Sequence, residues 1–336
     1  MSLPVTPPIK PMLAKLQSEI PDGEPWVYEP KWDGFRAIVF RDGTDVHIAS
    51  RDQKPLERYF PELVPAFQKC LPERCVVDGE VIVTGPEGLD FGSLLQRIHP
   101  AESRIKLLSE QTPASFVAFD ILALNDEDLR AEALVVRRRR LLESIDHEAM
   151  PEPGRGTKIS TTPQSADRED AIVWLETLEE IGLDGVIAKR DDGPYVEGDR
   201  VMVKVKQRRT ADCVVGGYRL SKTKDGVGSL LLGLYDSSGT LHFIGHTSSF
   251  KAPERRALLE QLRPLEGGEG FVGGRTPGGP SRWSSGRELN WVPLEPKLVC
   301  EVSYDKMQGD RFRHASTFVR WRDDKKPADC TMDQVL

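Results

Sequence analysis

The 336-residue sequence has no long apolar run and few cysteine or histidine residues. No run approaches the roughly 20 residues that a membrane-spanning helix needs. The start, residues 1–16, lacks the basic head and apolar core of a signal peptide. The five cysteines show no CxxC spacing and the six histidines form no HExxH pattern, so a disulfide framework and a zinc site are unsupported. These absences predict a protein of the reducing cytoplasm without a membrane segment.

The composition is that of a globular protein, with 38% hydrophobic and 29% charged residues, and the length favours two domains. The formal net charge of −7 is unevenly distributed. Residues 1–208 carry 27 Lys and Arg against 37 Asp and Glu, whereas residues 209–336 carry 19 against 16. A slightly basic second half can hold an anionic partner. A solvated asymmetry without function is an equally open interpretation.

Strand and helix patterns are mixed over residues 1–208 without a regular alternation, which favours an α+β fold over a doubly wound sheet. The proline-rich N-terminal segment is expected to be irregular until Trp26. Beyond it, hydrophobic periodicity predicts strands at Phe35–Arg41, Asp45–Ala49, Cys75–Val83, Ser115–Leu122, Gly185–Lys189 and Val201–Lys206. It predicts helices at about Pro61–Cys70, Ala131–Ile145 and Ser165–Ile181. The run Arg137–Arg140 is expected to be a solvated basic face of a helix, with a binding patch as the alternative.

After residue 208 the sequence pattern changes to short strands separated by glycine turns, which suggests a small barrel. Strands are expected at Cys213–Tyr218, Ser229–Tyr235, Leu241–His246, Leu298–Tyr304 and Ser316–Arg320. A helix is expected at about Pro253–Leu262, and Glu266–Glu288 is expected to be a flexible loop.

The stretch Tyr28–Phe40, YEPKWDGFRAIVF, sets Lys31 between Glu29 and Asp33, beside a glycine turn and close to Arg36. A surface ion pair is the ordinary explanation of such a lysine. A lysine becomes a nucleophile only when it loses its proton, and its ordinary pKa is about 10.4. Because carboxylates alone raise that pKa, a reactive lysine needs cations or a metal ion nearby.

The segment Val201–Lys206, VMVKVK, can supply those cations. As a strand it places its three valines on one side and Met202, Lys204 and Lys206 on the other. Two lysines that project together from a strand can hold a phosphate and favour deprotonation of a neighbouring lysine. A half-exposed strand with solvated lysines is the alternative.

Carboxylates recur near the ends of the predicted strands. Asp78 and Glu80 lie on one side of a strand, and Asp184 begins another. Such groups suit Mg²⁺ or ribose hydroxyls, although turn and surface acids explain each alone. Phe119 lies in the apolar run VAFDIL and is either buried core or a stacking platform for a base. Near the C-terminus, Arg320, Arg322 and Lys325 suit phosphate binding, or form part of a solvated basic tail.

In chain order these segments resemble the ATP-dependent DNA ligases of the covalent nucleotidyltransferase superfamily, from end to end. The nearest type is the short two-domain bacterial ligase C, which is similar to the ligase domain of ligase D. The signatures that carry the resemblance are Lys31-Trp32-Asp33-Gly34-Phe35-Arg36, Ser50-Arg51-Asp52, Asp78-Gly79-Glu80, Ala118-Phe119-Asp120, Asp184-Gly185-Val186-Ile187-Ala188-Lys189, Val203-Lys204-Val205-Lys206 and Arg322-Asp323-Asp324-Lys325. The family usually carries glutamate at the position of Asp184, whose shorter side chain leaves metal contact open, directly or through water.

The resemblance implies a nucleotidyltransferase (adenylation) domain of antiparallel sheets and flanking helices over residues 1–208. An OB-fold β-barrel over residues 209–336 follows it, with a hinge near Arg208–Asp212. The implied catalytic residue is Lys31. The implied ATP- or AMP-binding residues are Glu29, Arg36, Arg51, Glu80, Phe119, Lys189, Lys204, Lys206, Arg322, Asp324 and Lys325. The implied metal ligands are Glu80 and Asp184.

The implied activity is the sealing of 5′-phosphate/3′-hydroxyl nicks in duplex DNA through lysyl-AMP, as in DNA repair, by a monomer that uses ATP with Mg²⁺ or Mn²⁺. In these roles Phe119 stacks on adenine, Glu80 binds the ribose hydroxyls, and the C-terminal Arg322 and Lys325 act on the leaving pyrophosphate. Two alternatives stay open: an RNA ligase or capping guanylyltransferase of the same superfamily, and a nucleic-acid-binding module without catalysis.

Overall fold

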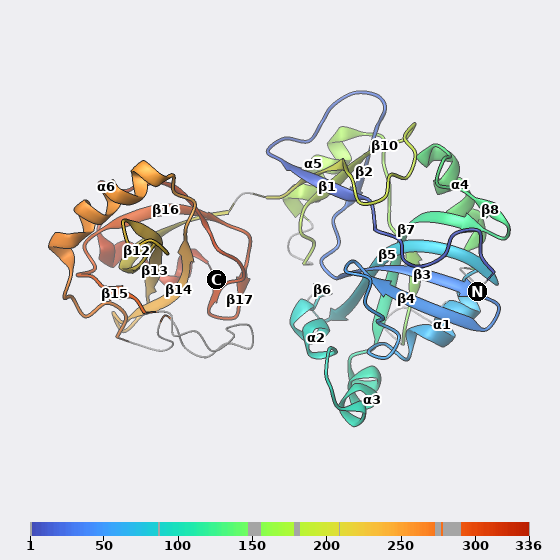
Figure 1. Ribbon diagram of the computed structural model, residues 1–336, viewed down its shortest axis with the longest axis horizontal. Helices are drawn as coiled ribbons and strands as arrows, with labels where there is room; N and C mark the ends of the chain where they lie inside the picture. Colours follow the sequence, from blue (N-terminus) through green and yellow to red (C-terminus); the bar gives the residue numbers. More distant parts are fainter. Residues whose placement is uncertain are drawn as a thin grey trace. The chain divides into compact units, whose positions relative to one another are not determined.

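The computed structural model describes residues 2–86, 88–146, 156–177, 182–207, 209–272, 277 and 290–335. The chain divides into two compact units, Met1–Gln207 and Arg208–Leu336, called unit 1 and unit 2 below. Figure 1 shows the elements of each unit. Among the described residues, no helix is long and apolar enough to cross a membrane.

The larger sheet of unit 1 has seven strands. They are β3 (Phe35–Asp42), β4 (Asp45–Ser50), β5 (Arg74–Gly85), β6 (Gly88–Leu89), β7 (Ala114–Leu124), β8 (Glu127–Asp128) and β9 (Ile159–Thr161). The order is β4-β3-β5-β7-β8, with β6 beside β5 and β9 beside β7. The pairs along this order are antiparallel, and β7–β9 is parallel. The strands predicted here are confirmed, and β5 and β7 extend beyond the predicted bounds.

The smaller sheet of unit 1 has four strands in the order β1-β11-β10-β2. They are β1 (Leu13–Gln17), β2 (Trp26–Pro30), β10 (Val186–Arg190) and β11 (Arg200–Val205). The expectation of irregular chain until Trp26 is wrong, because β1 pairs in parallel with β11. Because β1 and β11 lie at opposite ends of unit 1 in the sequence, no local sequence pattern predicts that they pair. Val201 is 44% exposed, so only the other two valines of β11 pack into a core.

Five helices are described in unit 1: α1 (Leu63–Cys70), α2 (Phe91–Gln96), α3 (Glu102–Gln111), α4 (Leu134–Ser144) and α5 (Arg168–Thr177). The predictions of α1, α4 and α5 are confirmed, whereas α2 and α3 were not predicted. Alternate residues of the large sheet face opposite cores, as the period of a strand requires. Val39 packs with residues of α1 and α4, while Ile38 packs with Met202 of the smaller sheet. The two sheets of unit 1 therefore share a core.

The arginine run in α4 is not the solvated face that was expected. Arg137 is fully buried, and its Nε and Nη2 donate to Asp120 at 2.8 and 2.9 Å. Arg138 is also buried and donates to the carbonyl of Thr162. The side of α4 that carries Arg137 packs against β7, where Asp120 lies within the apolar run. A buried ion pair thus holds α4 to the sheet, and only Arg139 is fully exposed.

The described part of unit 2 has a six-stranded sheet, a separate two-stranded sheet and one long helix. Its strands are β12 (Arg209–Leu220), β13 (Val227–Tyr235), β14 (Leu241–Thr247), β15 (Val292–Pro293), β16 (Val299–Tyr304), β17 (Met307–Gln308), β18 (Arg311–Phe312) and β19 (Thr317–Trp321). Its helices are α6 (Ala252–Leu262) and the short turns η1 (Arg263–Leu265), η2 (Pro327–Asp329) and η3 (Met332–Gln334). The main order is β14-β13-β12-β16-β19, and β17 and β18 form the two-stranded sheet. An isolated β-bridge between Thr247, at the end of β14, and Ser316, just before β19, links the two edge strands of the larger sheet.

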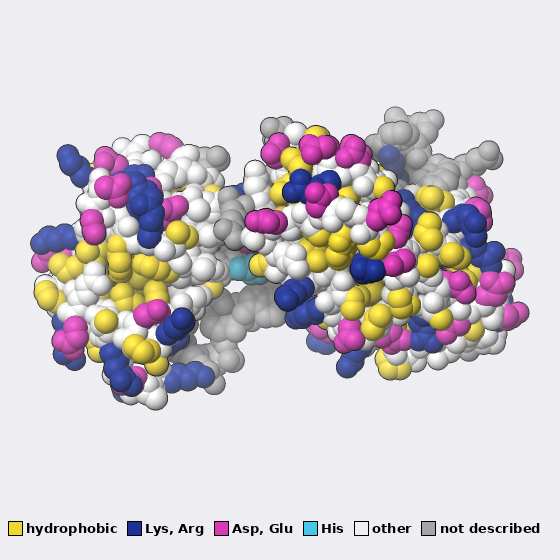
Figure 2. All heavy atoms as spheres, turned by 90° about the horizontal axis from the view of Figure 1, so that it is seen from above, with side chains coloured by type: hydrophobic (Ala, Val, Ile, Leu, Met, Phe, Trp, Pro, Cys, Tyr) yellow, Lys and Arg dark blue, Asp and Glu magenta, His cyan; other side chains and the backbone are white. Residues whose placement is uncertain are grey.

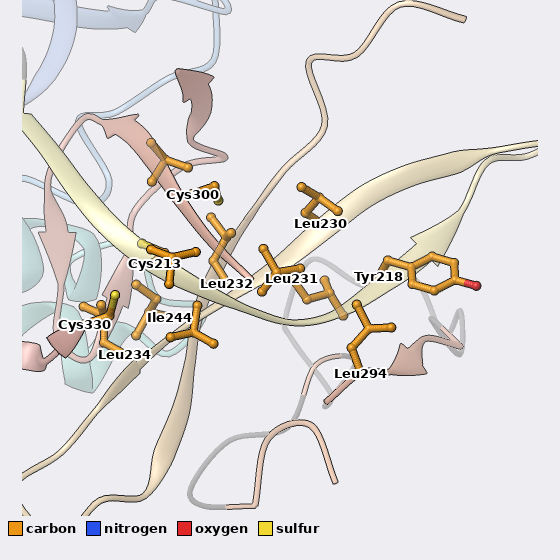
Figure 3. Packing of buried hydrophobic residues seen from close by; sticks show 14 of the residues in the cluster. Cys213, Tyr218, Leu230, Leu231, Leu232, Leu234, Ile244, Leu294, Cys300 and Cys330 are labelled. Atoms are coloured by element: carbon orange, nitrogen blue, oxygen red, sulfur yellow. The ribbon is translucent and has the colours of Figure 1, made fainter. Parts of the chain in front are cut away.

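The core of unit 2 is apolar and contains three thiols (Figure 3). Cys213 and Cys300 are directly paired across β12 and β16, and Cys330 belongs to the same cluster. All three are free and fully buried. The predicted strands and helix of this unit are confirmed. Most of the loop expected at Glu266–Glu288 lies outside the described residues.

Candidate active site

Lys31 follows β2 directly and is fixed by backbone hydrogen bonds to the turn before β10. Its N–H donates to the carbonyl of Gly185 at 2.8 Å, and the N–H of Asp184 donates back to its carbonyl at 2.9 Å. Gly185 has a φ of +130°, and a Cβ there would lie 2.1 Å from the carbonyl oxygen of Val205. Only glycine allows this approach, which explains the Asp-Gly pair of the signature.

The side chain of Lys31 meets a carboxylate that lies between two ammonium groups. Its Nζ is 2.5 Å from Asp184 Oδ2, and Lys206 Nζ is 2.9 Å from the same oxygen. Burial opposes ionisation of Asp184, but the charges of Lys31 and Lys206 outweigh it and lower the pKa of that carboxyl. Burial, together with the charges of Lys31 and Lys206, lowers the pKa of Lys204. The lysine that follows β2 and the lysines at the end of β11 thus gather at one point, as the sequence pattern predicts.

Arg36 is held rigidly at the edge of the same space. Its Nε and Nη2 donate to Asp78 Oδ1 and Oδ2, both at 2.6 Å, in a bidentate pair. The hydroxyl of Tyr195 donates to Asp78 at 2.6 Å and accepts from the N–H of Met12 at 3.0 Å. The guanidinium carbon lies 4.3 Å from the ring centroid of Phe119. Tyr195 lies in no signature, and sequence reasoning missed it.

Phe119 also contacts the ammonium group of Lys189, 4.8 Å from the ring centroid. That ammonium lies 2.8 Å from Glu29 Oε2, and Gln164 Nε2 donates to Glu29 Oε1 at 2.8 Å. Glu29 and Lys189 are both buried. The motif residues of β2, β7 and β10 therefore form one network of charges packed on an aromatic ring.

Glu80 is the carboxylate with the most perturbed ionisation in this region. Burial raises its pKa to about 7, and the charges of Arg36 and Lys31 offset part of that rise. A desolvated carboxylate of this kind suits a ligand that brings positive charge or hydrogen-bond donors.

These side chains line one cavity of about 190 Å³. Eight of the residues predicted to bind ATP or to react line it: Glu29, Lys31, Arg36, Arg51, Glu80, Phe119, Lys189 and Lys204. Lys206 and Asp184 adjoin it through Lys31. Lining residues outside the predicted set include Met12, Trp32, Ile187, Arg200 and Met202. Trp32 and Ile187 lie within two of the signatures but were assigned no binding role. Met12, Arg200 and Met202 lie outside the signatures, and the pairing of β1 with β11 brings them to the cavity.

The predicted magnesium ligands form a sparse donor set. Within the part of the chain that the structure describes, no three His, Cys, Asp or Glu side chains cluster as a metal cage. Asp184 Oδ2 is engaged by two ammonium groups, whereas Glu80 faces the cavity. Mg²⁺ commonly takes one or two carboxylates together with substrate phosphates and water. The residues present fit such a shared site and not an all-protein one.

The other predicted phosphate-binding residues lie in unit 2, around Asp212 of β12. Arg322 Nη1 is 2.8 Å from both carboxylate oxygens of Asp212, and Lys325 Nζ is 2.8 Å from Oδ2. Arg322 also donates from Nε to Asp324 at 2.8 Å. The hydrogen bond from Arg322 lowers the pKa of Asp324 to about 2. Asp212 was not among the predicted residues.

Comparison with known proteins agrees with this geometry. The family described as the ATP dependent DNA ligase domain matches residues 11–206, and the ATP dependent DNA ligase C terminal region matches residues 223–325. DNA ligase C1 of Mycolicibacterium smegmatis is 52% identical over 100% of this chain and 96% of its own length. DNA ligase C of Mycobacterium tuberculosis is 47% identical with the same coverage.

More distant relatives share the architecture. The multifunctional non-homologous end joining protein LigD of Mycobacterium bovis is 30% identical over 90% of this chain and 37% of its own length. A solved Lig E DNA ligase has a TM-score of 0.56 at 18% identity, covering 94% of this chain and 100% of that one, which supports the fold alone. The predicted fold class, an α+β nucleotidyltransferase domain followed by an OB-fold, is confirmed. This chain belongs to the ATP-dependent DNA ligases.

Proposed function

We propose that this chain seals nicks between a 5′-phosphate and a 3′-hydroxyl in duplex DNA through a covalent adenylate on Lys31. The observation that supports this most directly is the cavity in which Lys31 lies among Arg36, Glu80 and Lys204. Residues 1–208 act as the adenylation domain and residues 209–336 as the OB-fold domain in this proposal.

In the first step Nζ of Lys31 attacks the α-phosphorus of ATP. A phosphorus–nitrogen bond forms, the bond to the bridging oxygen breaks, and pyrophosphate leaves with that electron pair while the amine proton passes to solvent. The ion pair with Asp184 has to separate before Nζ reaches phosphorus. Lys204 and Lys206 stabilise the negative charge on the α-phosphate, because nucleotidyl transfer is catalysed mainly by positioning and charge neutralisation.

The nucleotide is held by the network that surrounds Lys31. Phe119 stacks on adenine, Glu29 and Lys189 close the pocket behind it, and Glu80 binds the ribose hydroxyls. Mg²⁺, when bound with the phosphates near Glu80 and Asp184, supplies charge neutralisation. Arg322 and Lys325 of unit 2 act on the leaving pyrophosphate, and Asp324 takes part through its pairing with Arg322.

Two transfers complete the cycle. An oxygen of the DNA 5′-phosphate attacks the lysyl adenylate, so that AMP moves to DNA and the amine is restored. The 3′-hydroxyl then attacks the DNA phosphate, a phosphodiester forms, and AMP leaves. Arg36 and Arg51 hold nucleotide or DNA phosphate in these steps.

The decisive experiment is intact-mass measurement after incubation with ATP and Mg²⁺. We expect the wild-type chain to gain one AMP, Lys31→Ala to gain none, and the matched control Lys106→Ala, an exposed residue of α3, to behave as wild type. The absence of an adduct in the wild type would favour a binding module instead.

The nucleic-acid substrate is tested with labelled ATP or GTP followed by nicked DNA or nicked RNA. We expect labelling by ATP and transfer to DNA. Labelling by GTP alone would identify a capping-type enzyme, and transfer to RNA in preference to DNA would identify an RNA ligase.

A further inference from the structure

Asp212 lies at the centre of a charged cluster in unit 2, more than a hundred residues before its partners in sequence. Its carboxylate accepts from Arg322 Nη1 through both oxygens and from Lys325 Nζ, all at 2.8 Å. The Asp212 side chain is only 12% exposed, so water competes little for these bonds. Two cations from the C-terminal segment are therefore gathered by one carboxylate on a strand.

The backbone of Asp212 is fixed as well. The N–H of Asp212 donates to Gln334 Oε1 at 3.1 Å, and Gln334 Nε2 donates to the Asp212 carbonyl at 3.3 Å. On its other side β12 pairs with β16, where Asp212 is opposite Glu301. The end of the chain thus clamps the strand at the position from which the carboxylate projects.

The guanidinium of Arg322 has two edges with different surroundings. The Nη1 side faces Asp212, which is 12% exposed, whereas Nε and Nη2 face Asp324, which is 64% exposed. An exposed carboxylate is weakly held and exchanges readily with another anion. The Nε–Nη2 edge presents the fork that binds phosphate in a bidentate manner. A phosphate can therefore replace Asp324 while Asp212 keeps its hold.

We infer that Asp212 is a positioning residue for lysyl-AMP formation: it holds Arg322 and Lys325 together so that both meet the leaving pyrophosphate. This rests on the proposed role of those two cations. A pair of cations fixed in advance does not have to be ordered at the moment of reaction, and this preorganisation accelerates the step in which pyrophosphate leaves. The last step, the sealing of an adenylated nick, releases no pyrophosphate and does not need the pair.

The test is the variant Asp212→Asn, which keeps the shape but removes the charge. We expect the apparent second-order rate constant of Lys31 adenylylation, measured in single turnover over a range of ATP concentrations, to fall about tenfold or more. Sealing of pre-adenylated nicked DNA should stay within about twofold of wild type. A purely structural role would lower both rates in proportion to the fraction of folded protein, and that result would overturn the inference.

Three further variants make the outcome unambiguous. Asp236→Asn removes another well-bonded carboxylate of unit 2, one that accepts from Ser238, and should leave both rates unchanged. Gln334→Ala keeps the charge, loosens the clamp and should slow adenylylation by a smaller factor; it decides the matter if Asp212→Asn does not fold. Arg322→Ala tests the proposed role itself. If Arg322→Ala adenylylates slowly while Asp212→Asn and Gln334→Ala react at normal rates, only the inference about Asp212 is rejected. If Arg322→Ala adenylylates at the normal rate, the proposed role of Arg322 is rejected.

Discussion

The two units differ most in where they keep their charged side chains. Among its described residues, unit 1 buries nine of them: Glu29, Asp33, Arg41, Asp78, Arg97, Asp120, Arg137, Arg138 and Lys189. Among the residues that the structure describes, unit 2 buries no charged side chain; its buried polar residues are Ser229, Thr247 and Ser316. Every described charged side chain of unit 2 is at least partly exposed, and both signs are interspersed on the face drawn in Figure 2.

This difference separates two ways of handling a nucleotide. Buried charges are costly unless they are paired, and the pairs of unit 1 are bidentate or shared among several partners. They give the cavity around Lys31 a fixed arrangement before any ligand arrives. The exposed partners in unit 2, such as Asp324, can instead be exchanged. One unit provides a fixed site, and the other provides cations that can change partners.

The largest expected effect on stability concerns the buried ion pair between Arg137 and Asp120 in unit 1. Arg137→Met leaves Asp120 without its partner in a dry environment, which typically costs about 3–5 kcal/mol of unfolding free energy. Both side chains are at most 2% exposed. Urea denaturation, with hydrogen exchange to assign the transition to a unit, measures the loss.

The matched control is Arg139→Met on the exposed side of the same helix, and the counterpart in unit 2 is Arg320→Met. Arg320 is 58% exposed and pairs with Glu301. Exposed pairs contribute about 0–1 kcal/mol. If Arg320→Met destabilised unit 2 as much as Arg137→Met destabilises unit 1, the contrast between the units would be lost.

An intermediate effect is expected for Glu80→Gln. The pKa of Glu80 is raised to about 7 from its ordinary 4.5, mainly by burial, so the folded protein holds this proton more tightly than the unfolded chain. Stability of the wild type is therefore lost as pH rises from 4.5 through 7. Because the carboxylate is partly exposed, we discount the gain from Glu80→Gln at pH 8 to about 1 kcal/mol, or roughly 2–4 °C in Tm.

Thermal scans without nucleotide at pH 5 and pH 8 test this. The advantage of Glu80→Gln should shrink toward pH 5, and Glu73→Gln, a substitution outside the cavity, should show no such trend. An advantage that grew at low pH would contradict the assigned sign.

The smallest effect is expected in unit 2, at His246 of β14. Burial and the charge of Arg219 lower the pKa of this imidazole below its ordinary 6.5. The neutral ring is therefore favoured in the fold, and stability present above pH 6.5 is lost as pH falls below that value. His246→Gln should lose less stability than wild type between pH 7.5 and 5, with a difference within about 2 °C in Tm. An equal pH dependence of the two proteins would show that His246 does not contribute.

The signatures predicted the cavity well where one strand or turn brings its own residues together. Arg36 and Glu80 are directly opposite each other on the paired strands β3 and β5, and Lys31 lies in the short segment that joins β2 to β3; all three side chains line the cavity. The predicted antiparallel strands were also recovered, because period-2 patterns survive burial on one face.

Several contacts between distant segments escaped prediction. Nothing near Arg137 indicates that Asp120 needs a partner, and a run of arginines in isolation resembles a solvated face. Asp212 likewise looks like an ordinary strand acid until β12, β19 and the C-terminal turn come together. The β1–β11 pairing joins two ends of a unit. The periodicity of a sequence segment predicts its own secondary structure, but it does not identify which distant segment or side chain it will contact.

The five cysteines carry a last consequence. Burial is the first cause that raises the pKa of every one of them, to about 12 for Cys75 and about 11 for Cys330. Peroxide reacts with thiolate and hardly with thiol, so these sulfur atoms are chemically quiet while the chain is folded. Oxidative damage to this ligase should therefore begin with molecules that have opened, and nucleotide binding that stabilises unit 1 should protect Cys70 and Cys75 in proportion to its affinity.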